Sequence, residues 1–295
     1  MANHKSPMKK YTLKNFQSDF PNDEACLEWL KNYRYPEGIY CKICDKVTKH
    51  HLMKSRRSFS CQECGHHVHP TAGTVFHKST TPLTTWFYVT YLMAQTRGGI
   101  SAKQIQRETG VTYKTAWRMC NRIRKRLNED VSPFGGEVEV DDSYFGGKHK
   151  GKRGRGAEGK TPVLGIVKRK GKIKAVVVPN LKTKTVAPII DKQVSKEANL
   201  YSDEFRPYGI LSRMGYNHQR VLHGQGIYVI GNVHTNTVEG FWSIVKNGIR
   251  GVFHSVSPQH LQYYLNEYSF RYNHRDDVTP MFFTFLHRTG MVTGG

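Results

Sequence analysis

The apolar residues of the chain repeat with two different periods. Residues 15–34 carry apolar side chains at helical spacing, which predicts an amphipathic helix near the N-terminus. A second helical stretch begins at Pro82 and ends at Gly98–Gly99. From Val138, beyond a linker of proline and glycine, apolar and charged residues alternate as they do in a β-strand. The second half of the chain therefore begins a different kind of domain.

This second half predicts a mixed sheet covered by helices. The expected strands are 138–142, 162–168, 173–178 and 199–202, and the expected helices are 185–194, 237–249 and 261–273. Three early strands, a helix, a further strand and then helices are typical of an α/β domain with a mixed sheet.

Residues 101–126 predict two helices joined by a tight turn. Ser101 and Thr112 are placed to cap the helices, and Gly110 supplies the turn. The second helix is expected to carry basic residues on its outward face, which favours a helix-turn-helix over an ordinary hairpin with a solvated charged face. If this pair of helices binds DNA, we expect Tyr113, Lys114 and Arg118 to contact the edges of the bases. We expect Arg122, Arg124 and Arg126 to contact the phosphates.

Four of the six cysteines form two CxxC pairs, Cys41 with Cys44 and Cys61 with Cys64. This spacing is typical of a closed, structural Zn²⁺ site in a small β ribbon. Four reduced cysteines close by chance, or disulfides, are weaker explanations. The nearby His66, His67 and His69 could replace a thiolate, but four cysteines already complete the shell. Cys26 and Cys120 lie in apolar helical contexts and are expected in the core.

Charge predicts the class of partner. Lys and Arg number 45 against 23 Asp and Glu, a formal net charge of +22, and such an excess is typical of proteins that bind nucleic acids. The longest apolar run, residues 86–94, is far below the roughly 20 residues of a membrane span. The first residues also lack the apolar core of a signal peptide. We therefore expect a soluble protein of a reducing compartment, with no membrane partner.

A basic, glycine-rich segment lies between the first two expected strands of the α/β domain. Its cations are Lys148, Lys150, Lys152, Arg153 and Arg155. Such a segment cannot pack a core, so it is either a solubilising loop or one that follows a phosphate backbone. The glycines favour the second interpretation because they let backbone amides approach phosphates.

Three carboxylates occupy positions that suit metal-dependent phosphoryl transfer. Asp141 and Asp203 each end an expected strand, and Glu239 lies one turn into an expected helix. Such a set can bind two divalent cations about 3.5–4 Å apart, for which Mg²⁺ or Mn²⁺ is suited. Each acid alone is more often a cap or a surface charge. Lys246 lies two turns beyond Glu239 on the same helical face and is expected to contact DNA phosphate.

Several segments together resemble the bacterial insertion-sequence transposases that have an N-terminal zinc ribbon and an RNase H-like catalytic domain, a group similar to the eukaryotic Merlin elements. The resembling segments are the ribbon and residues 73–77, 99–117, 140–147, 234–242 and 268–275. The resemblance extends from about residue 18 to residue 288.

The resemblance implies roles for individual residues. Asp141 and Asp203 match the first two catalytic acids of the family. The third position varies in this group, and both Asn236 and Glu239 lie in the matching segment. We favour Glu239, because a carboxylate binds Mg²⁺ better than an amide does. Asp142 matches a further acidic position and is expected to face the other side of the sheet from Asp141.

The resemblance also implies an enzyme that cuts the ends of a mobile element in double-stranded DNA and joins them to target DNA. It would act as a dimer or higher oligomer on DNA, in the cytoplasm with the bacterial nucleoid. The alternatives are a catalytically inactive DNA-binding regulator and an RNase H-like nuclease that does not join strands. We expect a helical lead-in (1–37), the ribbon (38–80), the helix-turn-helix (81–130) and the catalytic domain (137–288).

Overall fold

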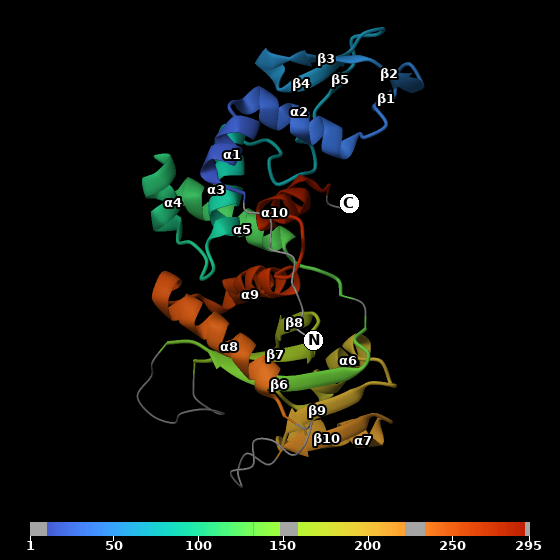
Figure 1. Ribbon diagram of the computed structural model, residues 1–295, viewed down its shortest axis with the longest axis vertical. Helices are drawn as coiled ribbons and strands as arrows, with labels where there is room; N and C mark the ends of the chain where they lie inside the picture. The colour runs from blue at the N-terminus through green and yellow to red at the C-terminus, as the bar shows by residue number, and fades with distance from the viewer. Residues whose placement is uncertain (1–10, 132, 148–158, 222–233, 293–295) are drawn as a thin grey trace, which may run out of the picture. The chain divides into compact units, whose positions relative to one another are not determined.

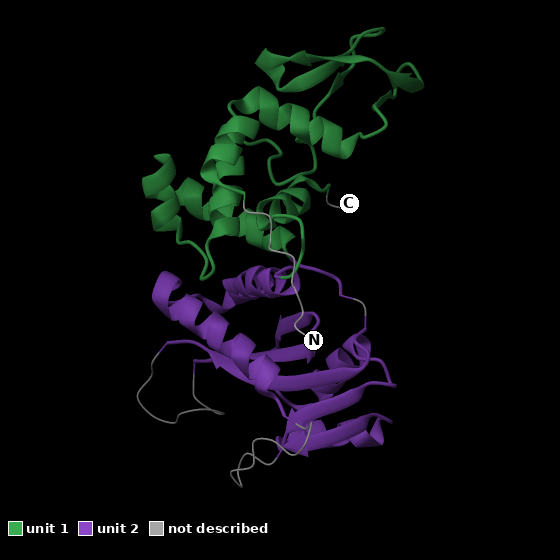
Figure 2. Ribbon diagram, in the orientation of Figure 1, with its two compact units in different colours: residues 1–127, 276–295 green, residues 128–275 purple. Residues whose placement is uncertain are grey.

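The computed structural model describes residues 11–131, 133–147, 159–221 and 234–292. The chain forms two compact units (Figure 2). Unit 1 comprises residues 1–127 and 276–295, and unit 2 comprises residues 128–275. The basic segment with Lys148, Lys150, Lys152, Arg153 and Arg155 lies outside the described residues.

Unit 1 begins with two helices where the sequence predicted one. Helix α1 (Leu13–Asp19) and helix α2 (Asp23–Arg34) are separated by Phe20, Pro21 and Asn22. Asn22 starts the second helix, because its side-chain oxygen accepts a hydrogen bond from the Ala25 amide at 2.9 Å. The single amphipathic helix predicted over 15–34 is therefore wrong in its continuity.

The cysteine region forms two small sheets. Strand β1 (Ile39–Cys41) pairs with β2 (Lys46–Thr48), and β3 (His50–Met53), β4 (Ser58–Cys61) and β5 (His67–Val68) form a second antiparallel sheet. A short helical turn, η1 (Lys54–Arg56), joins β3 to β4. The strands bring the two CxxC turns together, as the sequence predicted.

The rest of unit 1 is helical. Helix α3 (Leu83–Gln95) precedes α4 (Ala102–Thr109) and α5 (Tyr113–Arg126), and the predicted caps of the last two are present. The Ser101 hydroxyl accepts from the Gln104 amide at 3.1 Å, and the Thr112 hydroxyl accepts from the Thr115 amide at 3.3 Å. Gly110 has a φ of 71°, the left-handed conformation that a tight turn requires.

The chain returns to unit 1 in helix α10 (Met281–Gly290), which the sequence pattern did not predict. This helix packs against α2 and α3. Its Phe282 ring lies 5.8 Å from that of Phe16 and 5.9 Å from that of Phe20. Unit 2 ends at residue 275, whereas the predicted catalytic domain extends to residue 288.

Unit 2 contains a five-stranded mixed sheet in the order β10-β9-β6-β7-β8. The strands are β6 (Glu137–Phe145), β7 (Thr161–Lys168), β8 (Ile173–Val177), β9 (Asn199–Asp203) and β10 (Asn217–Val221). Strands β6, β7 and β8 are antiparallel neighbours, whereas β9 runs parallel to β6 and β10 parallel to β9. The predicted mixed sheet is confirmed, and β10 is an additional edge strand.

Helices cover both faces of this sheet (Figure 1). One face packs α6 (Thr183–Gln193), η2 (Arg206–Gly209) and α7 (Ile210–Arg213) against a core that includes Val138 and Val140. The other face packs α8 (Asn236–Gly248), the helical turn η4 (Ile249–Phe253) and α9 (Pro258–Asn273) against a core that includes Phe145 and Trp242. Alternate residues of β6 thus serve different layers.

Helix α8 approaches the sheet closely at Gly165 of β7. A Cβ atom at this position would lie 2.4 Å from Cζ2 of Trp242 and 3.1 Å from Cγ2 of Val238. We therefore expect Gly165→Ala to displace α8 and to lower the free energy of unfolding by about 1–3 kcal/mol, measured by urea denaturation.

Gly240→Ala on the same helix is the matched control. A Cβ there meets no atom within 4 Å, and alanine favours a helix over glycine, so the free energy of unfolding should rise by up to about 1 kcal/mol. Equal stability of the Gly165→Ala protein and the wild type would contradict the close approach.

Candidate active site

Two of the predicted acids lie at the same end of adjacent strands. Strands β6 and β9 are parallel, and their register pairs Glu139 with Tyr201 and Val140 with Ser202. Asp141 and Asp203 are the next residues on the two strands, so they share a face at the carboxyl ends. The register therefore brings together the two side chains that the sequence had singled out separately.

Asp141 faces helix α8. Its Oδ2 accepts a hydrogen bond from the indole nitrogen of Trp242 at 3.1 Å. Asp142 faces the other layer, where its Oδ1 accepts a bond from the Tyr208 hydroxyl at 3.3 Å. The prediction that the two neighbouring aspartates lie on opposite faces of the sheet is confirmed.

Negative charge accumulates around Asp141. Burial, followed by the charges of Asp142, Asp203 and Glu239, raises the pKa of the Asp141 carboxyl to about 7. Ionisation of Asp141 is therefore less favourable than that of an ordinary aspartate. A divalent cation would relieve this repulsion, so the donor set fits Mg²⁺ or Mn²⁺ in its chemistry.

The third predicted position lies on the first turns of α8. Asn236 and Glu239 are both exposed, and Glu239 accepts a hydrogen bond from the Thr235 hydroxyl at 2.7 Å. Over the described residues, only the four cysteines bring three or more Cys, His, Asp or Glu ligand atoms within 4.8 Å of one another. The carboxylates of Asp141, Asp203 and Glu239 act on one another electrostatically but do not converge on one point. In a two-ion site the ions lie about 3.5–4 Å apart, so ligands that bind different ions need not all meet within 4.8 Å of one another.

Glu139 connects this helix to the sheet, and the sequence reasoning missed it. Its side chain has no exposed surface. One carboxylate oxygen accepts from the Thr237 amide at 2.9 Å and the Val238 amide at 3.0 Å, and the other accepts from the Thr237 hydroxyl at 2.8 Å. These amides begin α8, so a carboxylate of β6 satisfies donors that the start of a helix leaves open.

Arg169 compensates the buried charge of Glu139. Its Nε donates to Glu139 at 2.7 Å, another guanidinium nitrogen donates to the His234 carbonyl at 2.8 Å, and the group lies 4.3 Å from the ring centroid of Tyr201. Glu139 lies two residues before Asp141, so strand alternation places both on the α8 side. Because Glu139 and Asp141 alternate in step along the strand, the sequence could have placed Glu139 on the same face as Asp141.

Lys246 lies near the carboxylates, as the helical spacing predicted. Burial lowers the pKa of its ammonium, Asp141 and Asp142 oppose that shift, and the charges of Arg250 and Lys160 add to it. Among the described residues, Lys246 has no ion-pair partner.

Further along the chain, Arg271 donates to the buried Glu267 at 2.6 Å and forms part of the packing of α9.

The cysteine cluster fits zinc. The Sγ atoms of Cys41 and Cys64 are 3.5 Å apart, those of Cys44 and Cys61 are 3.8 Å apart, and all four lie within 4.8 Å of one another. Tetrahedral Zn²⁺ with bonds of about 2.3 Å requires sulfur atoms roughly 3.8 Å apart. The two cysteines outside the cluster, Cys26 and Cys120, are buried in the core.

The exposed face of α5 carries Tyr113, Lys114 and Arg118, as predicted. The Lys103 ammonium of α4 lies 4.9 Å from the Tyr113 ring centroid and adds a cation to this surface. Lys125, which the prediction omitted, is also exposed. Residues 114, 118 and 125 fall at helical spacing, so they form one basic stripe.

The outward placement of Arg124 is wrong. The side chain is 2% exposed, and its guanidinium donates to the Ile100 carbonyl at 3.3 Å. Arg124 follows the buried Cys120 by one turn, so helical periodicity directs it inward.

Two further arginines of α5 have structural contacts. Arg122 is exposed but donates to the Val75 carbonyl at 3.1 Å. Arg126 is half-buried and donates to the Gly73 and Met291 carbonyls, both at 2.9 Å. Their predicted phosphate contacts therefore compete with contacts within unit 1.

Comparison with known proteins relates each unit to a transposase domain. Residues 133–273 match the model of the ISXO2-like transposase domain, and residues 21–67 match that of the transposase zinc-ribbon domain. An uncharacterised protein of the transposable element ISH50 from Halobacterium salinarum is 27% identical over 271 residues, 85% of this chain and 91% of that protein. An uncharacterised transposase-like protein from Haemophilus influenzae is 30% identical over 107 residues, 36% of this chain and 85% of that protein.

Across the described residues, the structure contains no helix with the length and apolar character that crossing a bilayer requires.

Loss of one thiolate should remove the metal from the ribbon. We expect about one zinc ion per chain in the purified, reduced protein and almost none in Cys61→Ser, because three thiolates leave the shell open. Elemental analysis measures the content. Cys26→Ala removes a thiol outside the cluster and should keep its zinc, and full zinc content in Cys61→Ser would contradict the assignment.

Proposed function

Because the chain belongs to the family of insertion-sequence transposases that combine a zinc-ribbon domain with an ISXO2-like transposase domain, we propose that it binds the ends of a mobile DNA element, cleaves them and transfers the strands to target DNA. The observation that most supports this chemistry is the register of β6 and β9, with Asp141 and Asp203 side by side under α8. The catalytic domain would be RNase H-like, as the sequence resemblance implies.

Asp141, Asp203 and Glu239 would hold two Mg²⁺ or Mn²⁺ ions. When bound, these ions supply Lewis acidity to the attacking and the leaving oxygen of the phosphodiester. Asn236 would contribute a neutral oxygen beside Glu239. Trp242 orients Asp141 through its indole hydrogen bond, and Glu139 fixes the helix that carries the third acid. Lys246 would hold a DNA phosphate near the reacting one.

Unit 1 would recognise DNA. The α4–α5 pair would act as a helix-turn-helix, with the exposed start of α5 in the major groove and the zinc ribbon contributing further contacts. We propose that the protein works as a dimer or higher oligomer on DNA, with the bacterial nucleoid as its place of action. The glycine-rich basic segment would follow the phosphate backbone.

Removal of a metal-facing charge should abolish chemistry and preserve binding. We expect Asp141→Asn or Asp203→Asn to lower the rate of Mg²⁺-dependent cleavage by roughly a thousandfold or more, because transition-state charge is no longer stabilised. The assay uses the purified zinc-containing protein and labelled DNA from the flanks of its gene. Cleavage at the wild-type rate by both variants would show that these acids are not the metal ligands.

The identity of the third ligand is tested in the same assay. Glu239→Gln should be as damaging as the aspartate changes, and Asn236→Ala less damaging, because Mg²⁺ prefers a carboxylate. The reverse result would assign the third position to Asn236. A wild-type protein that binds DNA but never cleaves it would instead be a DNA-binding regulator.

Two lysines of α5 should affect DNA binding differently. Lys114→Ala should relax sequence preference, because Lys114 lies at the start of the helix that would enter the groove. Lys125→Ala should weaken binding to all sequences and reduce the salt slope by about 1, as expected for one lost phosphate contact. Titrations of element-end and unrelated DNA at several salt concentrations separate these effects. Equal losses on both DNAs for both variants would contradict the assigned roles.

A further inference from the structure

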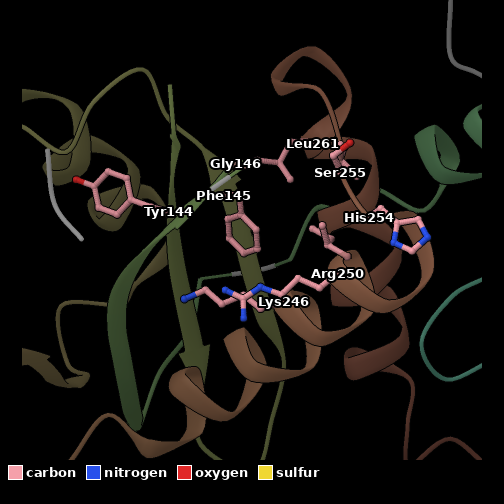
Figure 3. A pocket seen from close by; sticks show the side chains of 11 residues that line it. Tyr144, Phe145, Gly146, Lys246, Arg250, His254, Ser255 and Leu261 are labelled. Atoms are coloured by element: carbon pink, nitrogen blue, oxygen red, sulfur yellow. The ribbon is translucent and has the colours of Figure 1, made fainter. Parts of the chain in front are cut away.

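Two cationic side chains lie near the end of β6, beyond Asp141. Lys246 belongs to the last turn of α8, and Arg250 follows it in η4. Figure 3 shows both side chains extended past the Phe145 ring. Burial lowers the pKa of the Lys246 ammonium, and the charges of Arg250 and Lys160 lower it further. These cations are therefore close enough to repel one another.

The helix end alone does not account for this positive charge. A helix places only about half a negative charge at its C-terminus, which balances less than one cation. Asp141 is the principal opposing charge on Lys246, and the proposed function assigns that carboxylate to a metal ion. In the part of the chain that the structure describes, neither Lys246 nor Arg250 has an ion-pair partner. Positive charge therefore remains that an anion would balance.

Lys246 and Arg250 border a small hollow of about 70 Å³. Gly146 and Gly147 form its strand side, and no Asp or Glu is among the described residues that line it. One water needs roughly 10–15 Å³ of such space, so the hollow has room for about five water-sized groups. A phosphate group, with one phosphorus and four oxygen atoms, fits this volume, whereas a nucleoside does not.

The backbone that carries Arg250 has an uncommon conformation. The turn η4 is π-helical, a rare geometry that is frequent at functional sites. It ends at His254, which has a φ of 61° and a ψ of −48°, and the Ser255 amide donates to the Phe253 carbonyl at 2.7 Å across it. A γ-turn with positive φ is strained, and such strain clusters at catalytic and ligand-binding sites. This observation is independent of the charges and concerns the same wall of the hollow.

The position of Arg250 along the helix relates the hollow to the carboxylates. Trp242 donates to Asp141, and Arg250 lies roughly 12 Å beyond Trp242 along the helix axis. Successive phosphates of one DNA strand are about 3.4 Å apart along the duplex axis. A strand that follows α8 from Asp141 would therefore present to Arg250 a phosphate roughly three or four nucleotides from the cleaved one.

We propose that this hollow is a seat for one backbone phosphate of the DNA, bound by Arg250 together with Lys246 and distinct from the phosphate that is cleaved. This inference rests on the proposed function and specifies how the site holds its substrate. The sugar and the base stay outside the hollow, so the contact is independent of sequence. The planar guanidinium can donate two hydrogen bonds to one phosphate, which fixes the register of the strand and thereby the place of the cleaved phosphate at Asp141.

The test removes the negative charge from one phosphate at a time. The full-length zinc-containing protein is titrated with element-end duplexes that each carry a single uncharged methylphosphonate linkage, with Ca²⁺ in place of Mg²⁺ to slow cleavage. At the seated phosphate, this change should raise the Kd of the wild type about tenfold, the loss expected for one charge-assisted contact. Arg250→Gln should raise the Kd for unmodified DNA by a similar factor. In that variant the methylphosphonate at the seated position should cause little further loss, because both changes remove the same contact.

Two matched comparisons complete the design. Arg213→Gln removes an equal charge from helix α7 of the same unit, where Arg213 is exposed, and its effect should add to that of the methylphosphonate. Ser255→Asp places a carboxylate in the lining and should weaken binding about as much as Arg250→Gln does. Ser255→Asn has the same shape without the charge and should bind like the wild type. Circular dichroism and zinc content check that each variant is folded.

The inference is overturned if the losses from Arg250→Gln and from the methylphosphonate add at every position tested. It is also overturned if Arg213→Gln cancels the loss at the seated position as Arg250→Gln does, or if Ser255→Asn weakens binding as much as Ser255→Asp.

The proposed function is tested separately in the same preparation by restoring Mg²⁺. Binding and cleavage by the wild type, with additive losses at every position, would overturn the phosphate seat alone. Absence of both binding and cleavage would overturn the transposase chemistry and the seat together.

Discussion

The arrangement of the candidate active site depends on one buried carboxylate. Glu139 has no exposed surface, yet it accepts hydrogen bonds from two backbone amides at the start of α8 and from the Arg169 guanidinium. A buried charge without partners would cost several kcal/mol, whereas here the amide donors and the arginine compensate it together. The same bonds fix the first turn of α8, and that turn carries Asn236 and Glu239. The sheet and the helix are thereby held in one geometry before any metal or DNA binds.

A second contact sets the depth of α8 on the sheet. Gly165 leaves space for the Trp242 indole, which reaches across β7 to Asp141 on the neighbouring strand. Glu139 and Asp141 are two residues apart on β6, so the strand holds the helix at two points on one face. Catalytic sites need their groups held within fractions of an ångström, and two fixed points on regular elements provide such precision better than a loop does.

The sequence predicted most elements of unit 2 because their apolar periodicity is strong, and it predicted the zinc ligands because their spacing is specific. It missed β10, whose residues Asn217 to Arg220 are polar and lie at the edge of the sheet, where no buried face imposes alternation. It also misplaced Arg124, since a basic residue in a basic helix was assumed to face solvent. The role of Glu139 was missed because its partners, Arg169 and the start of α8, lie far from it in the sequence. Pairing between distant segments decides which charges are buried, and a single sequence does not contain that pairing.

The charges around Asp141 in unit 2 indicate that binding of metal ions and binding of a DNA phosphate would depend on each other. The chain as a whole carries an excess of 22 positive charges, yet burial of Asp141 and the charges of Asp142, Asp203 and Glu239 raise the pKa of that carboxyl. Without cations this cluster repels itself and would also repel a phosphate. If divalent cations balanced the acids, the nearby Lys246 and Arg250 would leave the region net positive and attractive to a DNA strand. Under the proposed function, metal binding at Asp141 would therefore precede binding of the scissile phosphate, and the basic residues around the cluster would determine where the rest of the strand lies.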